Sequence, residues 1–304
     1  GEIGMVAFSE ELAKAAKYFR QVGTPASNKE NEFLLGSRFF KTVQHLPLAI
    51  AGRSIRKDQK AFELLSRLID ARIVLSLFGE EKSQTLDLEV WPWVKKIASL
   101  ADPSVEQVYE ISKDAFSSQN DLIQVGSVVF SNLNYEKSKD RKRILFALSL
   151  VTNSFDMETQ LVDSITAAET YLSAHKKGGF HLDHIAPKSL FKEEILEAEG
   201  GSWVHQPGNI ALLTSKDNIK IAAAEPKLKS GLYLSSKVIL TQALGTAEDN
   251  KLEGVVRKAI DGAHAAGHPT VESWGPDTVS QRNVYLWEKF SNRFKIENIY
   301  SDYV

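Results

Sequence analysis

The sequence predicts a mainly helical protein that surrounds one small element of two strands and a helix. Apolar residues recur at helical spacing along most of the 304 residues, and this texture changes only between about 178 and 225. The length is about twice that of a typical domain. We therefore expect a helical domain over 1–175 and a second domain over 176–304, whose strand-containing core covers about 179–225.

The helical part is predicted from about residue 7. Ser9 is placed to cap a first helix, with Leu12 and Phe19 on one face. The same spacing predicts a helix over 59–78, which Gly79 ends. Asp102-Pro103 has the order of a cap followed by a first-turn proline. Together with the later stripes it predicts helices over 102–116, 141–151 and 156–173.

The second part begins with shorter elements. Phe180 to Ile185 is typical of a short strand, which Pro187 ends. Asn209 to Thr214 predicts a second strand, and Lys216 to Ala224 predicts a short helix that stops before a proline. Two further helices are expected at about 247–266 and 276–294.

Composition excludes several classes of protein. The formal charge is −2 with a pI near 6.4, so a nucleic-acid surface must be a local patch. Cys is absent, which excludes disulfides and thiolate zinc sites. We find neither an apolar run of the ~18 residues that a membrane helix needs nor a signal peptide, and we expect a cytoplasmic protein. The start without Met is expected to mark a cloning remnant or a piece of a longer protein.

One ordered set of polar residues has catalytic potential. The first strand reads Phe180-His181-Leu182-Asp183-His184-Ile185, and Gly208-Asn209 and Asp217-Asn218 follow downstream. Near pH 7 a neutral imidazole can accept a proton from water, and Asp and Asn oxygens are ligands of the kind that Mg²⁺ prefers. Asp183 and His184 are adjacent, so on a strand they point to opposite faces. Spacing alone therefore assigns them no roles.

This order resembles the His-Asn-His (HNH) nuclease motif, in its Asp-His…Asn…Asn form, and the element resembles the ββα-metal fold. The resemblance implies a metal-dependent DNA endonuclease that nicks one strand. It implies that His184 activates water, that Asp183 and Asn218 hold Mg²⁺ or Mn²⁺, and that Asn209 braces the loop that aims His184. No structural zinc is expected. His181 shares a strand face with Asp183 and is either an extra ligand, a phosphate contact or a half-buried filler.

The segment over about 179–294 is also similar to the C-terminal nuclease domain of GmrSD-type modification-dependent restriction systems. There the motif precedes a Lys-containing segment, here Pro226 to Lys229, and a late helix with an Arg after a Trp, here Arg282 after Trp274. The similarity implies prokaryotic defence against phage or other foreign DNA. We find no nucleotide-binding motif of the kind typical of the N-terminal domain. The chain is therefore expected to be either the C-terminal nuclease half of such a protein, with the nucleotide-binding regulatory domain as a partner outside this chain, or a stand-alone relative. A homo-oligomer would allow both strands to be cut.

Basic residues supply candidate DNA contacts, which would be sequence-independent and salt-sensitive. A solvated helix face is the alternative for each of them. His205, in the loop before the second strand, is interpreted as a loop residue without a catalytic role. The candidate phosphate contacts are Lys176, Lys177, Lys220 and Lys227, and the densest basic run covers 137–143.

Two other functions fit the sequence. One is a DNA-binding or sensor module that has lost catalysis, and the other is a helical interaction scaffold in which the motif is a coincidence. In these cases Asp183 and His184 would be a surface pair at a turn, and Asn218 would be a helix-start cap. Asn209 would serve turn chemistry.

Overall fold

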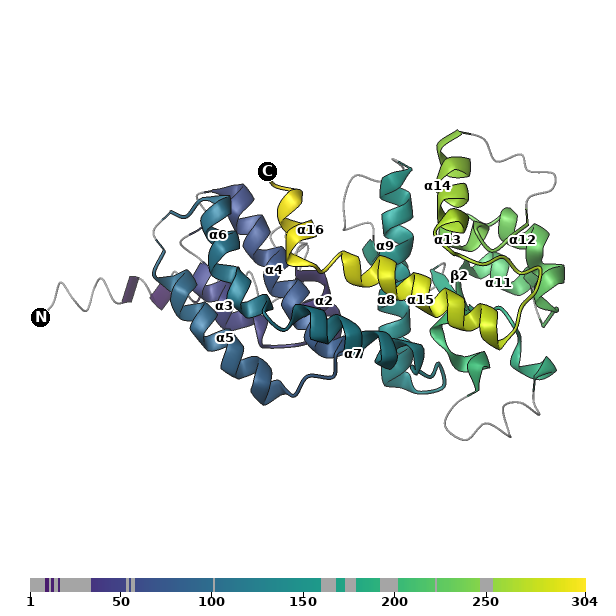
Figure 1. Cartoon of the computed structure of the whole chain (residues 1–304), viewed down its shortest axis with the longest axis horizontal. Helices are drawn as coiled ribbons and strands as arrows, with labels where there is room; N and C mark the ends of the chain where they lie inside the picture. The colour runs from purple at the N-terminus through teal and green to yellow at the C-terminus, as the bar shows by residue number, and fades with distance from the viewer. Residues whose placement is uncertain are drawn as a thin grey trace, which may run out of the picture. The chain divides into compact units, whose positions relative to one another are not determined.

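The computed structural model describes most of the chain and divides it into two compact units. Unit 1 comprises Gly1–Gly126 and Ser291–Val304, and unit 2 comprises Ser127–Phe290. The domain boundary expected after residue 175 stays a prediction, and each unit is treated by itself below; Figure 1 gives the order of the elements. The described residues are 9–10, 12–13, 16, 34–52, 55, 58–100, 102–159, 168–172, 179–191, 202–221, 223–246 and 254–304.

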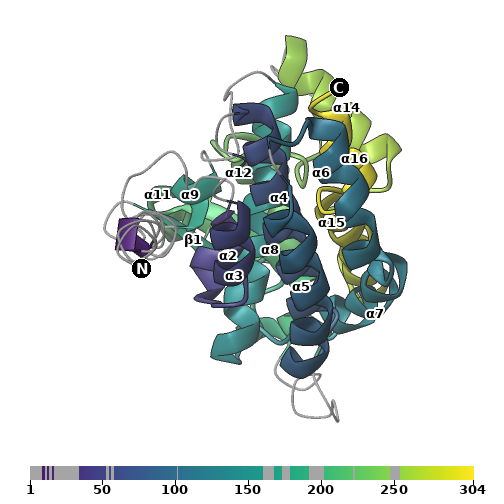
Figure 2. The ribbon, with the colours of Figure 1, turned by 90° about the vertical axis from the view of Figure 1, so that its left-hand side faces the viewer.

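Unit 1 is built around one buried helix, α4 (Gln59–Phe78), whose bounds match the predicted 59–78. Helix α4 packs against α2, α3, α6 and α16, as Figure 2 shows from the side of this unit. Leu64, Leu68 and Val74 of α4 are fully buried. The other elements of unit 1 are α2 (Leu35–Phe40), α3 (His45–Ala51), α5 (Ser83–Ala98), α6 (Val105–Ser112), η3 (Lys113–Phe116), most of α7 (Gln119–Ser131) and α16 (Ile296–Ser301).

A buried carboxylate joins α4 to the start of α2. The N-cap of α2 is Leu34, which has no side-chain acceptor. Asp70 of α4 replaces it: Oδ2 accepts from Gly36 N at 2.9 Å, and Oδ1 accepts from Ser37 N at 2.7 Å and from Ser37 Oγ at 2.8 Å. These amides belong to the first turn of a helix, which has no intrahelical acceptors, and a negative charge is favoured there. Asp70 is thus a cap supplied from 33 residues away.

Two local expectations in the helical part were wrong. The helix expected to begin after Asp102 is α6, which is capped by Ser104 in a capping box with Gln107, because the Ser hydroxyl accepts from the third helical amide. The helix expected over 156–173 is interrupted at Thr159, where α8 (Ser138–Glu158) ends; among the described residues that follow, α9 covers Ala168–Leu172. The cap expected at Ser9 serves a segment that lies mostly outside the described residues.

Unit 2 contains the predicted strand–loop–strand–helix element. Strands β1 (Phe180–His184) and β2 (Ile210–Thr214) are antiparallel, with Asp183 opposite Ala211 and His184 opposite Ile210. Helix α11 (Ser215–Ile221) follows β2 directly and contacts both strands. The mainly α fold class with a small ββα element is therefore confirmed.

Strand β2 is covered on both faces, so it is more apolar than a half-exposed strand. Ile210, Ala211, Leu212 and Leu213 are all buried, and helices α8 and α13 join α11 in covering the strand. Thr241 of α13 donates to Leu212 O at 2.7 Å, which fastens this helix to the sheet. The remaining elements are η5 (Lys188–Leu190), η6 (Trp203–His205), η7 (Pro207–Asn209), η8 (Pro226–Lys229), α12 (Ser230–Leu234), α13 (Ile239–Gln242), α14 (Gly254–Ala265) and α15 (Pro276–Asn292).

Across the described ranges, no helix combines the length and apolar character needed to cross a bilayer.

We expect Asp70→Asn to lower the free energy of unfolding by about 2 kcal/mol, because the amide NH₂ would face donors and leave a buried amide or hydroxyl unsatisfied. Urea denaturation followed by circular dichroism measures this loss. Asp261→Asn is the control: Asp261 makes an exposed ion pair with Arg257 at 3.0 Å, and such pairs contribute at most about 1 kcal/mol. Equal stability of the two variants would contradict the capping role.

Candidate active site

His184 ends β1 and is 9 % exposed. Its Nε2 lies 3.4 Å from Nδ1 of His205, and its ring meets the Tyr135 ring edge-on at 4.7 Å between centroids. Burial is the main cause that lowers the pKa of His184 to about 4, and His205, Lys229 and Arg141 lower it further. The imidazole is therefore neutral at pH 7, which is the form that can accept a proton.

Lys229 lies beneath the Asp-His pair. Its Nζ donates to His184 O at 2.8 Å and lies 3.8 Å from Asp183 Oδ2, and the lysine is fully buried. Burial lowers the pKa of Lys229 to about 8, and the nearby Asp183 carboxylate opposes that shift. Burial raises the pKa of Asp183, while Lys229 lowers it. The strand end thus carries a carboxylate and an ammonium in a poorly hydrated place.

Asn209 clamps the turn that follows His184. Its Oδ1 accepts from Ala186 N at 2.9 Å, and its Nδ2 donates to Ala186 O at 3.0 Å. Nδ2 also donates to Val204 O at 2.7 Å, and Oδ1 also accepts from Trp274 Nε1 at 2.8 Å. The residue is fully buried, and both amide protons and both acceptor directions are used. With these hydrogen bonds, Asn209 can hold the loop that positions His184 in one conformation.

Helix α15 holds the clamp in place. Arg282 Nη1 donates to the carbonyl oxygens of Gly208 and Ile210, both at 2.8 Å, on either side of Asn209. Asn283 Oδ1 accepts from Gly208 N at 2.6 Å. A Cβ on Gly208 would lie 2.2 Å from Val279 O, so only glycine lets the loop approach the helix this closely.

Asn218 lies in the second turn of α11 and is partly exposed. The alternative role of Asn218 is that of a helix-start cap. Thr214 has this role instead, because its Oγ1 accepts from Asp217 N at 3.2 Å and donates to Asp217 Oδ2 at 2.7 Å. The amide of Asn218 has no hydrogen-bond partner among the residues that the structure describes. Its oxygen is therefore available to a ligand.

The donors present suit a hard cation better than a zinc-type site. Asp183 and Asn218 offer a carboxylate and an amide oxygen, and Mg²⁺ is commonly held by few protein ligands while it keeps several waters. Within the described ranges, no three His, Cys, Asp or Glu side chains gather as a metal-binding cluster. The metal assignment of Asp183 and Asn218 stays a prediction.

Tyr135, just before α8, and Arg141 of α8 lie beside the imidazole pair. Arg141 lies over the Tyr135 ring at 4.6 Å, and its Nε donates to Tyr135 O at 3.0 Å. Tyr135 OH donates to Leu182 O at 3.2 Å, and Tyr135 N donates to His205 O at 2.9 Å. Glu136 forms an ion pair with Lys188. The basic run noted in the sequence therefore places one guanidinium, that of Arg141, at the site.

Other candidates lie elsewhere or outside the described residues. His181 is partly buried on β1, opposite Leu213. Lys227 is exposed and pairs with Glu272 at 3.2 Å, and its role as a phosphate contact stays a prediction. Lys176 and Lys177 lie outside the described residues, as does the side chain of Lys220.

Two site residues could not be assigned from sequence alone. His205, interpreted as a loop residue without a catalytic role, is buried against His184, and Lys229, to which the sequence assigns no role of its own, contacts the Asp-His pair. The sequence carried one signal for Lys229, the Lys-containing segment after the motif. It carried none for His205, because only the packing of the 202–209 loop brings the two rings together.

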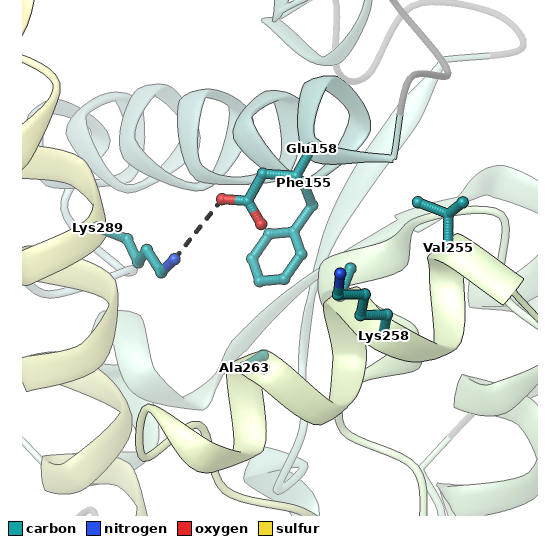
Figure 3. Close-up of a pocket in the computed structure, with 8 residues that line it drawn as sticks. Phe155, Glu158, Val255, Lys258, Ala263 and Lys289 are labelled. Atoms are coloured by element: carbon teal, nitrogen blue, oxygen red, sulfur yellow. Dashed lines mark ion pairs between the residues drawn. The ribbon is translucent and has the colours of Figure 1, made fainter.

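A hollow of about 480 Å³ in unit 2 does not include these residues. Figure 3 shows its lining from α8, α14 and α15, with an ion pair of 3.7 Å between Lys289 and Glu158. The lining has one carboxylate and no imidazole, so it lacks the groups for water activation.

Comparison with known proteins found one family. The model of the C-terminal domain of GmrSD restriction endonucleases matches residues 128–289. This range differs from unit 2 by one residue at each end. No curated protein and no solved structure matches the chain.

We expect Gly208→Ala to lower the free energy of unfolding by about 3 kcal/mol, because the added methyl would force the loop away from α15. Denaturation followed by tryptophan fluorescence measures this. The control is Gly231→Ala in α12, where a Cβ meets nothing within 4 Å and Ala favours the helix. A stable Gly208→Ala protein would show that the close approach is not required.

Proposed function

The chain belongs to the family of C-terminal domains of GmrSD restriction endonucleases, and from this premise we propose that it is a metal-dependent DNA endonuclease of the HNH type. The family supports nuclease activity on DNA in general. The HNH chemistry rests on one observation: the neutral imidazole of His184 ends a strand beside Asp183, and the turn behind it is clamped by Asn209. A rigid, correctly protonated base is the first requirement of phosphodiester hydrolysis.

His184 acts as the general base in this proposal. It takes a proton from the water that attacks phosphorus, and such a base contributes about 10²–10⁴-fold to the rate. Asp183 and Asn218 would hold Mg²⁺ or Mn²⁺, which when bound neutralises phosphate charge and stabilises the leaving oxygen. Asn209 and Lys229 hold the backbone on which His184 sits, through Ala186 and through the His184 carbonyl. Loss of this rigidity would misplace the base.

The proposed site cuts one DNA strand at a time. A monomer would nick one strand, and a homo-oligomer could cut both. Lys176, Lys177 and Lys220 are proposed as phosphate contacts, and Arg141 joins them because it lies beside the site. We further propose a role in prokaryotic defence against phage or foreign DNA, with a nucleotide-binding regulatory domain as partner.

We expect the protein to convert supercoiled plasmid to open circle with Mg²⁺ or Mn²⁺, and His184→Ala to lower the rate by about 100-fold or more, because the water then has no base. Gel electrophoresis measures the conversion, and EDTA is expected to stop it. His264→Ala, which removes an imidazole from α14, is the control and keeps the wild-type rate. Absence of nicking with every divalent ion, or equal nicking by His184→Ala, would favour an inactive DNA-binding module.

A further inference from the structure

His205 is a second buried imidazole that the proposed chemistry does not use. It ends η6, is 6 % exposed, and its ring stands at 81° to that of His184 with centroids 5.4 Å apart. The Nε2 of His184 and the Nδ1 of His205 are 3.4 Å apart. At this distance two neutral imidazoles form a hydrogen bond in which one ring donates and the other accepts.

Hydrogen bonds to the backbone of His205 hold it in the loop, and its ring can therefore pair with His184. His205 O accepts from Tyr135 N, and His205 N donates to Ser202 O, both at 2.9 Å. The nearest carboxylate oxygen, Glu136 Oε1, lies 3.8 Å from His205 Nδ1, beyond hydrogen-bond distance, and Glu136 is paired with Lys188. Among the residues that the structure describes, the Nδ1 of His205 therefore has one hydrogen-bond partner within reach, the ring of His184.

The two nitrogens of His184 have different surroundings. Nε2 faces His205. In the described part of the chain no group hydrogen-bonds to Nδ1, and Nδ1 is not among the buried polar atoms left without a partner. We infer from these two observations that Nδ1 is the nitrogen open to water.

Only one direction of the hydrogen bond between the two imidazoles leaves His184 able to act as a base. If His205 donated, it would occupy the Nε2 lone pair of His184, the proton of His184 would sit on Nδ1, and no lone pair would face the water. If His184 donates, its Nδ1 lone pair is free. The group that bonds Nε2 of His184 in this way decides whether Nδ1 carries a proton or can accept one.

We propose that His205 is a positioning residue that accepts the Nε2–H of His184 and so holds His184 in the tautomer whose Nδ1 takes the proton from water. This inference rests on the proposed function. In the step, an O–H bond of water breaks, its proton goes to His184 Nδ1, and the water oxygen bonds to phosphorus. The P–O bond to the leaving oxygen breaks, that oxygen keeps the electron pair, and it takes a proton from solvent. His205 changes neither its protonation state nor its bonds.

The direct test is the tautomer of His184 in the full chain, measured by ¹⁵N–¹H correlation spectra of protein labelled at histidine. The expected result is a proton on Nε2 and a bare Nδ1, with the His184 signals assigned by their loss in His184→Ala. A proton on Nδ1 would overturn the proposal. This measurement needs neither DNA nor activity.

Two substitutions separate positioning from packing. His205→Asn places an amide oxygen about where Nδ1 lies, so it is expected to keep the Nε2–H tautomer and most of kcat. His205→Leu fills similar space without an acceptor, and it is expected to give a tautomer mixture and a kcat about 100-fold lower with KM unchanged. His264→Leu is the matched control, because His264 bonds Ala243 O rather than another imidazole, and it should leave the His184 tautomer unchanged.

The outcomes distinguish this inference from the proposed function. A wild-type protein that never nicks refutes the function, while the tautomer spectrum still reports on the pair. A wild type that nicks, with a folded His205→Leu that keeps both rate and tautomer, refutes the positioning role alone. Equal loss in His205→Asn and His205→Leu would also refute it, because a correct acceptor would then not suffice.

Discussion

The buried amide of Asn209 is the interaction on which the rest of unit 2 depends. Its two polar side-chain atoms together bond partners in three parts of the chain: the turn after β1, the 202–209 loop, and the segment before α15. An unsatisfied buried amide is costly, so these three segments keep one arrangement or lose several hydrogen bonds together. The position of His184 follows from this arrangement, because Ala186 is only two residues further along the chain.

Burial also sets the charges around the clamp. The guanidinium of Arg282 is fully buried and is held by two carbonyl oxygens instead of a carboxylate, and burial lowers its pKa to about 10. Lys229 is likewise held by a carbonyl oxygen, with Asp183 at a longer distance. These bonds to backbone carbonyls fix the loop geometry; the charge of Lys229 is partly balanced by Asp183, whereas no ion pair is found for Arg282 among the described residues.

The family match and the candidate active site concern unit 2, whereas unit 1 is characterised by its packing and buried polar contacts. The range matched by the endonuclease family coincides with unit 2, and all residues of the candidate active site lie within it. Unit 1 is organised by apolar packing around α4 and by buried polar links such as the one between Asp70 and α2. Another link is that of Arg72, whose guanidinium is 1 % exposed and is paired with Glu81 and Glu89.

The amino-acid sequence by itself determined the local structure and the order of the chemical groups. It predicted α4 to the residue and the two strands and α11 closely, because periodicity and turn residues depend on neighbours in the chain, whereas the roles of Asp183, His184, Asn209 and Asn218 stay predictions. Even locally it failed where two signals competed, as at Asp102, where Ser104 and its capping box prevailed.

Only the tertiary structure decided which distant side chains meet. It brought Lys229 to the His184 carbonyl across 45 residues, buried His205 against His184 across 21 residues, and brought Arg282 to Gly208 across 74 residues. These choices depend on how loops pack and on which polar groups must be satisfied once they are buried. No spacing within a short stretch of sequence contains that information, because the partners are chosen by the fold as a whole.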